Sequence, residues 1–342
     1  MNADRFHAIT SRYPKLRIAV VGDFCLDRYL EIDPARGEIS IETGLAVYNV
    51  VRVRAQPGGA GTILNNLVAL GVGEIVAVGF CGDDGEGYEL RRELAKLPGV
   101  RLDHFLMTPD RLTFTYAKPL ILATNGIPVE QNRLDTKNWS PTPLGIQEKL
   151  AQSLRDLIPI VDAVVVLDQV DEPETGVVTR GLLKVIGELA ASHPEVIMIA
   201  DSRQGLRDWP RVIYKMNAAE LGSLVPDSKI STIDEVSAAA TELSSQNRQP
   251  VFVTLAERGI VIASSDGQVQ HVHALPVRGP IDIVGAGDAV TANLTCALAA
   301  NASPREAAEL ASVAASLVIH QVGTTGSARV VELLDLLDPA RS

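Results

Sequence analysis

Residues 282–288 read Asp-Ile-Val-Gly-Ala-Gly-Asp, between a Pro/Gly break at 278–280 and an Ala-rich helical stretch that begins near residue 287. Glycines at 285 and 287 let the backbone turn sharply and approach a ligand closely. The N–H groups that open a helix lack partners within it and lie at the positive end of its dipole. The segment therefore predicts an anion hole, made by the backbone of Gly285, Ala286 and Gly287, that suits a phosphoryl group.

Asp288 follows this turn directly and is the predicted general base. A carboxylate beside an anion hole can take the proton of a substrate hydroxyl. The same residue types also fit a helix cap after a tight turn. The residues alone leave both interpretations open.

Outward from this segment, buried strands alternate with helices. Continuous apolar runs predict strands, and amphipathic stretches bounded by glycine or proline predict helices. The alternation predicts a mostly parallel sheet covered on both faces, which is a three-layer α/β/α fold. We expect strands at 16–21, 75–80, 163–168, 196–201, 251–255, 259–263 and 269–275, and helices at 61–71, 87–97, 175–192, 287–300 and 303–320.

Two segments, 28–56 and 108–135, carry strand-like alternation outside this regular pattern. We expect them to form a small β-layer that acts as a lid over a crevice. Such a layer has an apolar face that needs cover, either from the site or from a second subunit in a two-fold dimer. Lys118 and Arg133 lie on this layer, where they either bind a substrate phosphate or belong to a solvated face.

Three predicted strands end in an acid, at Asp23, Asp168 and Asp201. In open α/β sheets the ligand crevice lies at the carboxyl ends of the strands. Each acid alone also fits a cap or turn. Together they favour a polar crevice at one sheet edge.

Composition excludes several classes of function. The 31 basic and 42 acidic residues give a net charge of −11 without a long basic run, so nucleic acid is a poor partner. No apolar run approaches the roughly 20 residues of a membrane span, and the N-terminus lacks a signal-like apolar region, so we expect a cytoplasmic protein without membrane contact. The three cysteines are far apart and have no zinc spacing. Neither a P-loop nor a G-x-G-x-x-G follows a strand.

The motifs together resemble the ribokinase (PfkB) family of sugar and nucleoside kinases. The segment Asp282–Asp288 resembles the family signature DTxGAGD, and four further motifs follow the family's order. The start at 22–29 and the tail at 311–326 look most similar to bacterial D-glycero-D-manno-heptose-7-phosphate kinases. The resemblance implies a ribokinase-like fold as one kinase domain over 1–342. The four motifs are Gly58-Gly59-Ala60 with Asn66, residues 81–87, Asn217–Glu220 and Thr254–Gly259.

The resemblance implies phosphoryl transfer from ATP to a hydroxyl of a sugar or sugar phosphate, with Asp288 as base and Gly285–Gly287 as anion hole. It places Mg²⁺ near Glu220 and Asn217, with water between the metal and the side chains. Those two residues also fit a helix cap with a capping box. A monovalent cation such as K⁺ is implied near Asp282 and the carbonyl of Val284. The implied sugar-side residues are Asp27, Gly58, Gly59, Asn66 and Asp168, and the implied nucleotide-side residues are Asn217, Thr254, Gly259 and Ser312.

The sequence also departs from the family pattern. Ile283 and Val284 replace the usual threonines, Ala256 replaces a glycine near the expected nucleotide phosphates, and Ser312 stands where Asn is common. Two alternatives therefore stay open: a nucleoside kinase of the same fold and a non-catalytic sugar- or nucleotide-binding protein. The low aromatic content of 4% speaks against the nucleoside kinase, which needs aromatic rings around the base.

Overall fold

The computed structural model describes residues 1–123, 128–225, 230–323 and 325–337. Its central sheet has the strand order β17-β16-β15-β14-β13-β12-β1-β6-β7, and β8 also pairs with β6. Neighbours from β15 to β7 are parallel, whereas β16 and β17 are antiparallel. These strands are β1 (Arg17–Gly22), β6 (Glu74–Gly82), β7 (Val100–Arg101), β8 (Phe105–Thr108), β12 (Ala163–Asp168), β13 (Ile197–Ser202), β14 (Ile213–Asn217), β15 (Val251–Thr254), β16 (Ile260–Ala263) and β17 (Val269–Val272).

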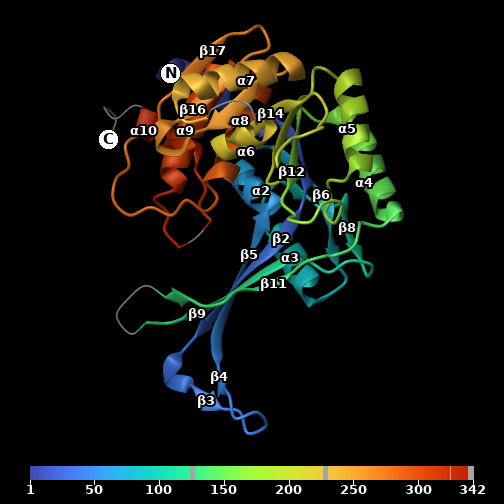
Figure 1. The fold of residues 1–342 in the computed structure, drawn as a ribbon, viewed down its shortest axis with the longest axis vertical. Coiled ribbons are helices and arrows are strands. Elements are labelled where there is room, and N and C mark those ends of the chain that lie inside the picture. The colour runs from blue at the N-terminus through green and yellow to red at the C-terminus, as the bar shows by residue number, and fades with distance from the viewer. Residues whose placement is uncertain (124–127, 226–229, 324, 338–342) are drawn as a thin grey trace.

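Helices cover both faces of this sheet (Figure 1). Because successive strand side chains point to opposite faces, Ile18 and Val20 of β1 join one apolar core, while Ala19 and Val21 join the other. The first core holds α1 (Ala3–Thr10), α2 (Ala60–Ala69), α3 (Gly85–Ala95), α8 (Ala286–Ala299), α9 (Pro304–Val318) and α10 (Val330–Leu337); the second holds α4 (Leu144–Leu157), α5 (Arg180–Ser192), α6 (Ala218–Leu224) and α7 (Ile233–Asn247). The predicted three-layer α/β/α fold is confirmed.

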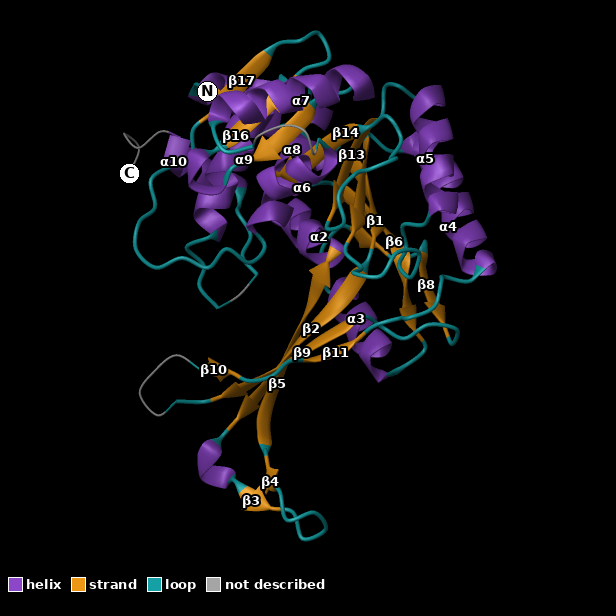
Figure 2. Ribbon diagram, in the orientation of Figure 1, coloured by secondary structure: helices purple, strands orange, loops and turns teal. Residues whose placement is uncertain are grey.

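A separate small sheet extends away from the body (Figure 2), as the sequence predicts. Its order is β10-β9-β2-β5, with β11 also paired to β9, and a short hairpin of β3 and β4 lies at its far end. β2 begins and β5 ends inside the body, so residues 24–27 and 57–59 belong to the small sheet as well. The elements are β2 (Phe24–Ile32), β3 (Glu38–Ile39), β4 (Ala46–Val47), β5 (Val50–Gly59), β9 (Thr115–Ile121), β10 (Val129–Glu130) and β11 (Leu134–Thr136).

One predicted helix begins later than expected. The helix predicted from residue 175 starts at Arg180, with Thr179 as its N-cap. The segment just before Arg180 is not helical. The Val177 N–H donates to the Asp23 carboxylate at 2.7 Å, and Glu174 has a positive φ of 66°. Single-turn 3₁₀ segments lie at Tyr13–Lys15, Pro34–Arg36, Ile158–Ile160 and Ala256–Arg258.

None of the helices in the described ranges combines the length and the apolar character needed to cross a membrane.

Candidate active site

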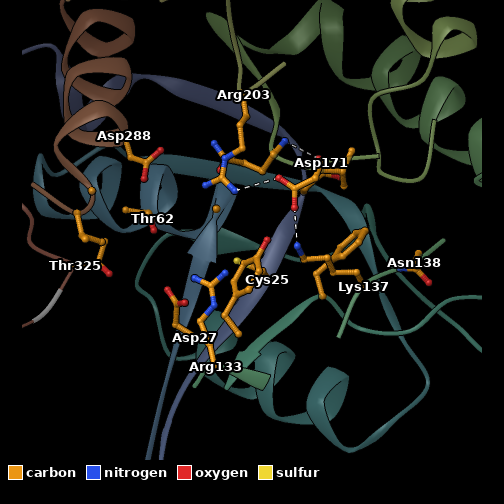
Figure 3. A pocket seen from close by; sticks show the side chains of 18 of the residues that line it. Cys25, Asp27, Thr62, Arg133, Lys137, Asn138, Asp171, Arg203, Asp288 and Thr325 are labelled. Carbon is orange, nitrogen blue, oxygen red and sulfur yellow. Dashed lines mark hydrogen bonds and ion pairs between the residues drawn. The ribbon is translucent and has the colours of Figure 1, made fainter. Parts of the chain in front are cut away.

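A cavity of about 470 Å³ lies between the small sheet and the carboxyl ends of the central strands. Its wall combines carboxylates, cations and a few apolar side chains (Figure 3). The charged residues that line it are Asp23, Asp27, Lys118, Arg133, Lys137, Asp171, Glu172, Arg203 and Asp288.

Asp288 reaches this cavity from the first turn of α8, whose N-cap is Gly285 with φ 82°. Burial and the negative charges of Asp201 and Asp27 raise the pKa of Asp288 to about 7, against the opposing charges of Lys215 and Arg203. A carboxyl with a pKa near neutrality is suited to accept a proton at physiological pH.

The predicted anion hole lies beside it, at the start of α8. Gly287 is exposed and Gly285 lines the cavity. The Ala286 N–H already donates to the Ile283 carbonyl at 3.2 Å. Ala286 would therefore have to exchange this bond for a phosphoryl oxygen.

Behind the anion hole lies a buried ion pair that the sequence analysis did not assign. Lys215 of β14 donates to Asp201 at the end of β13 over 2.6 Å, and the Thr291 hydroxyl of α8 donates to the same carboxylate oxygen at 3.0 Å. Burial would lower the pKa of Lys215, but the carboxylates of Asp201, Asp288 and Glu220 raise it overall. A lysine within the apolar run of β14 was the signal available in the sequence, because lysine is almost never buried unless it is paired.

Of the residues predicted to bind the sugar, Asp27, Gly58 and Gly59 lie together where β2 pairs with β5. A Cβ on Gly58 would lie 2.6 Å from the Asp27 carboxylate, so only glycine leaves room for that carboxylate. Gly59 has φ 58°, a conformation that other residues seldom adopt. Asp27 forms an ion pair of 3.1 Å with Lys118 of β9.

Three cations that line the cavity form ion pairs with two carboxylates. Lys137 contacts Asp171 at 2.6 Å, and Arg203 contacts the same carboxylate at 3.7 Å. Arg133 pairs with Asp135 at 2.8 Å. In Figure 3, Arg203 enters the cavity from above and Arg133 from below. Of these cations the sequence analysis singled out Arg133 but missed Lys137 and Arg203, which lie in irregular segments between the motifs.

Asp168 lies beside the cavity without lining it. Its Oδ2 accepts from the Ser202 hydroxyl at 2.9 Å, while its buried Oδ1 has no hydrogen-bond partner among the described residues. Burial and the neighbouring Asp23 raise the pKa of Asp168 to about 7. Asp23 lines the cavity and accepts backbone N–H groups from Gln169 and Val177.

Asn217 and Glu220 form a complete capping box at the start of α6, the alternative that the sequence left open. The Asn217 side chain accepts from the Glu220 N–H at 2.9 Å, and the Glu220 carboxylate accepts from both nitrogens of Asn217. Burial raises the pKa of Glu220 despite these hydrogen bonds. The cap does not exclude a second role, because carboxylate and amide oxygens keep lone pairs free for Mg²⁺-bound water.

The other nucleotide-side residues lie along the same edge of the sheet. Thr254 at the end of β15 pairs in register with Asn217, and its hydroxyl donates to the Met216 carbonyl at 3.3 Å. Gly259 has φ 96°, and a Cβ there would overlap the Val272 carbonyl. The Ser312 hydroxyl donates to the His273 carbonyl at 3.3 Å. These residues lie outside the 470 Å³ cavity.

Two residues predicted to bind a ligand, Asn66 and Asp282, form hydrogen bonds within the protein instead. Asn66 is fully buried in α2 and donates to the Thr62 carbonyl at 3.0 Å, away from the cavity lining. The Asp282 carboxylate accepts the Val284 N–H at 3.0 Å and the Gly323 N–H at 3.2 Å, which fixes the turn before α8. No group of three or more His, Cys, Asp or Glu within the described residues is arranged to hold a metal ion.

Comparisons with known proteins identify a family profile and several similar proteins. Residues 184–330 match the profile described as pfkB family carbohydrate kinase. The chain is 32% identical over 329 residues to "Bifunctional protein HldE" of Hyphomonas neptunium and 31% identical over 325 residues to the protein of that name from Paramagnetospirillum magneticum, covering 94% and 93% of this chain. The chain spans only 64% and 63% of the length of these relatives.

Solved structures share the fold at low sequence identity. Ribokinase of Arabidopsis thaliana, complexed with ribose and ATP, has a TM-score of 0.67 and 19% identity over 94% of this chain and 98% of its own. Phosphofructokinase-2 of Escherichia coli, in complex with substrates and products, has a TM-score of 0.70 and 18% identity over 96% of this chain and 100% of its own. These similarities support the ribokinase-like architecture.

Proposed function

We propose that the chain is a carbohydrate kinase of the PfkB family, a phosphotransferase with a sugar hydroxyl as acceptor, and that it transfers the γ-phosphoryl group of ATP to a hydroxyl of a sugar phosphate. One observation carries this proposal. The lining of the same cavity contains Asp288, at the start of α8, and three cations, Arg133, Lys137 and Arg203. It can therefore orient an acceptor by its phosphate while a hydroxyl faces the base.

In the proposed mechanism, Asp288 takes the proton of the acceptor hydroxyl as its oxygen attacks the phosphoryl group in line. The N–H groups of Gly285, Ala286 and Gly287 face the negative charge of the transferring group. Phosphoryl transfer depends mainly on positioning and on charge stabilisation of this kind.

The acceptor's sugar ring would lie against Asp27 and Lys118, with Gly58 and Gly59 behind them. Its phosphate would replace Asp171 and Asp135 as partner of the cavity cations, because cations bind phosphate as readily as carboxylate. A volume of about 470 Å³ falls within the range of small-molecule sites. Given the likeness of the 22–29 and 311–326 segments, the acceptor we propose is D-glycero-D-manno-heptose 7-phosphate.

Mg²⁺ would be organised by Asn217 and Glu220 through water, where it neutralises phosphate charge. One carboxylate and one amide oxygen suit this ion, since Mg²⁺ keeps several waters and uses few protein carboxylates. A monovalent cation such as K⁺ would be held mainly by backbone carbonyls near Val284, because Asp282 already accepts two N–H groups. The nucleotide would extend from α8 past Thr254 and Gly259 toward Ser312.

A second copy of the chain would cover the small sheet, giving a homodimer through the lid. This proposal rests on large apolar side chains that the outer part of the sheet exposes to solvent, among them Ile39, Ile41, Leu45, Tyr48 and Val51. Sizing chromatography with light scattering checks it. Ile41→Asp should give monomers, whereas Val331→Asp, at an exposed apolar position of α10, should not.

We also propose a cytoplasmic setting, where ATP and sugar phosphates are available.

An acceptor panel tests the function. The purified protein is incubated with ATP, Mg²⁺ and either phosphorylated or free sugars, and ADP release is measured. We expect turnover with the heptose phosphate and a KM for phosphorylated acceptors that rises about tenfold in Arg203→Met, the effect of one lost charged hydrogen bond. The matched control is Arg155→Met on the exposed side of α4. Turnover only with free sugars, or an equal effect in both variants, would exclude a phosphate subsite at Arg203.

A further inference from the structure

We propose that Lys215 is a catalytic residue whose ammonium contacts the γ-phosphoryl group as it is transferred. This inference rests on the proposed function. It adds a fixed cation to the anion hole, where the backbone of α8 alone supplies only partial charges.

The position of Lys215 is the first argument. Its side chain extends from β14 toward the start of α8, and a Cβ placed on Gly287 would lie only 3.2 Å from its Nζ. Gly287 itself is exposed, so the ammonium lies just behind the predicted phosphoryl site. A residue larger than glycine at position 287 would separate the cation from a bound anion.

The surrounding charge is the second argument. Asp201 contacts the Lys215 ammonium directly, and the charges of Asp288 and Glu220 also raise the pKa of Lys215. A phosphoryl group that enters this region meets strong repulsion unless a cation offsets it. Lys215 is that cation, and it belongs to β14 of the central sheet.

The mode of attachment is the third argument. Lys215 donates one hydrogen bond to Asp201, at 2.6 Å, and an ammonium carries three N–H donors. Asp201 is in turn fixed by Thr291 of α8. The carboxylate therefore orients the ammonium toward α8 and leaves donors for a phosphoryl oxygen.

The competing explanation is that Lys215 merely neutralises the buried charge of Asp201. A double variant separates the two explanations. In Lys215→Met/Asp201→Asn neither buried charge remains, so a merely neutralising lysine is no longer needed. The matched control is Lys184→Met, an exposed lysine of α5.

The experiment measures nucleotide affinity by calorimetry as well as turnover. We expect wild-type protein to bind the ATP analogue AMP-PNP, and Lys215→Met to lose affinity for AMP-PNP about ten- to a hundredfold more than for ADP, because only AMP-PNP carries a γ-phosphoryl group. Turnover should fall about 10²–10³-fold, and the double variant should stay equally impaired.

Two results would overturn the inference: an unchanged ratio of AMP-PNP to ADP affinity in Lys215→Met, or recovery of turnover in the double variant. Thermal unfolding of each variant shows whether it is folded. The affinity ratio needs no acceptor, so it tests Lys215 even if every sugar phosphate in the panel fails. A wild type that binds AMP-PNP but phosphorylates no acceptor would instead count against the proposed function.

Discussion

The ammonium of Lys118 lies 3.1 Å from the carboxylate of Asp27, and the two side chains come from neighbouring parallel strands of the small sheet. Both are largely shielded, with 14% and 12% of their side chains exposed. Lys118 also lies over the ring of Tyr29, 4.9 Å from its centre. The pair is therefore set in position before any ligand arrives, as the proposed sugar site requires.

Lys118→Met should raise the KM for the acceptor about tenfold and change kcat much less, because it removes a charged partner of the sugar and not the base. Initial rates over a range of acceptor concentrations give both constants. Lys149→Met, on an exposed position of α4, serves as the control. A fall in kcat at constant KM would place Lys118 in the chemical step instead.

Asp288→Asn should lower kcat about 10²–10⁴-fold while AMP-PNP binding stays nearly unchanged, since it removes a general base without changing the shape of the site. With wild-type protein, kcat/KM should rise as the pH rises through about 7, because the pKa of Asp288 is raised to about 7 and only the carboxylate accepts a proton. A variant with near wild-type turnover would refute the assignment.

Asp168→Asn should raise the Tm by about 2–4 °C at pH 8 and much less at pH 4. The pKa of Asp168 is raised to about 7 in the folded protein, above its usual value near 4, so folding holds a proton that the unfolded chain releases. Stability is thus lost as the pH rises from about 4 to about 7. Asn keeps the contact with Ser202 and removes the titration.

Thermal unfolding at the two pH values measures this effect. Asp103→Asn, whose side chain is 61% exposed, should leave the Tm within about 1 °C at both. A Tm gain in Asp168→Asn that is equal at pH 4 and pH 8 would contradict the linkage.

Glu220→Gln should raise the Mg²⁺ concentration for half-maximal activity about tenfold and leave the acceptor KM unchanged, since the carboxylate is assigned to the water shell of the metal. Glu235→Gln is a matched control, because Glu235 completes a capping box of the same kind at the start of α7. If both variants show the same Mg²⁺ titration, Glu220 serves only as a cap.

The sequence predicted the fold well because its strands are buried on both faces. The runs at 17–22 and 163–168 are nearly continuous apolar residues, and such runs are typical of parallel strands. It failed at residues 175–179, where the backbone binds the distant carboxylate of Asp23 instead of entering a helix. The helix propensity of a short segment contains no information about a contact with residues about 150 positions away in the sequence.

The candidate site was predictable only where residues form a contiguous motif. The turn at Gly285–Asp288 depends on neighbours in sequence, so its place in the structure follows from local geometry. Lys215 and Arg203 were not predicted, because the roles proposed for them depend on tertiary contacts, with α8 in one case and with Asp171 in the other. Asn66 belongs to one of the family motifs, yet its side chain is buried in α2 and donates to a carbonyl of the same helix.

The uninterrupted course of β2 also constrains how this protein can change in evolution. Asp27 and the outer part of the small sheet share one strand, from Phe24 to Ile32, without a loop between them. Because side chains alternate between faces, inserting or deleting one residue between Phe24 and Asp27 would turn the carboxylate to the opposite face of the sheet. Length variation among homologues should therefore accumulate beyond Ile32, around the β3–β4 hairpin, while the stretch that carries Asp27 keeps a fixed length.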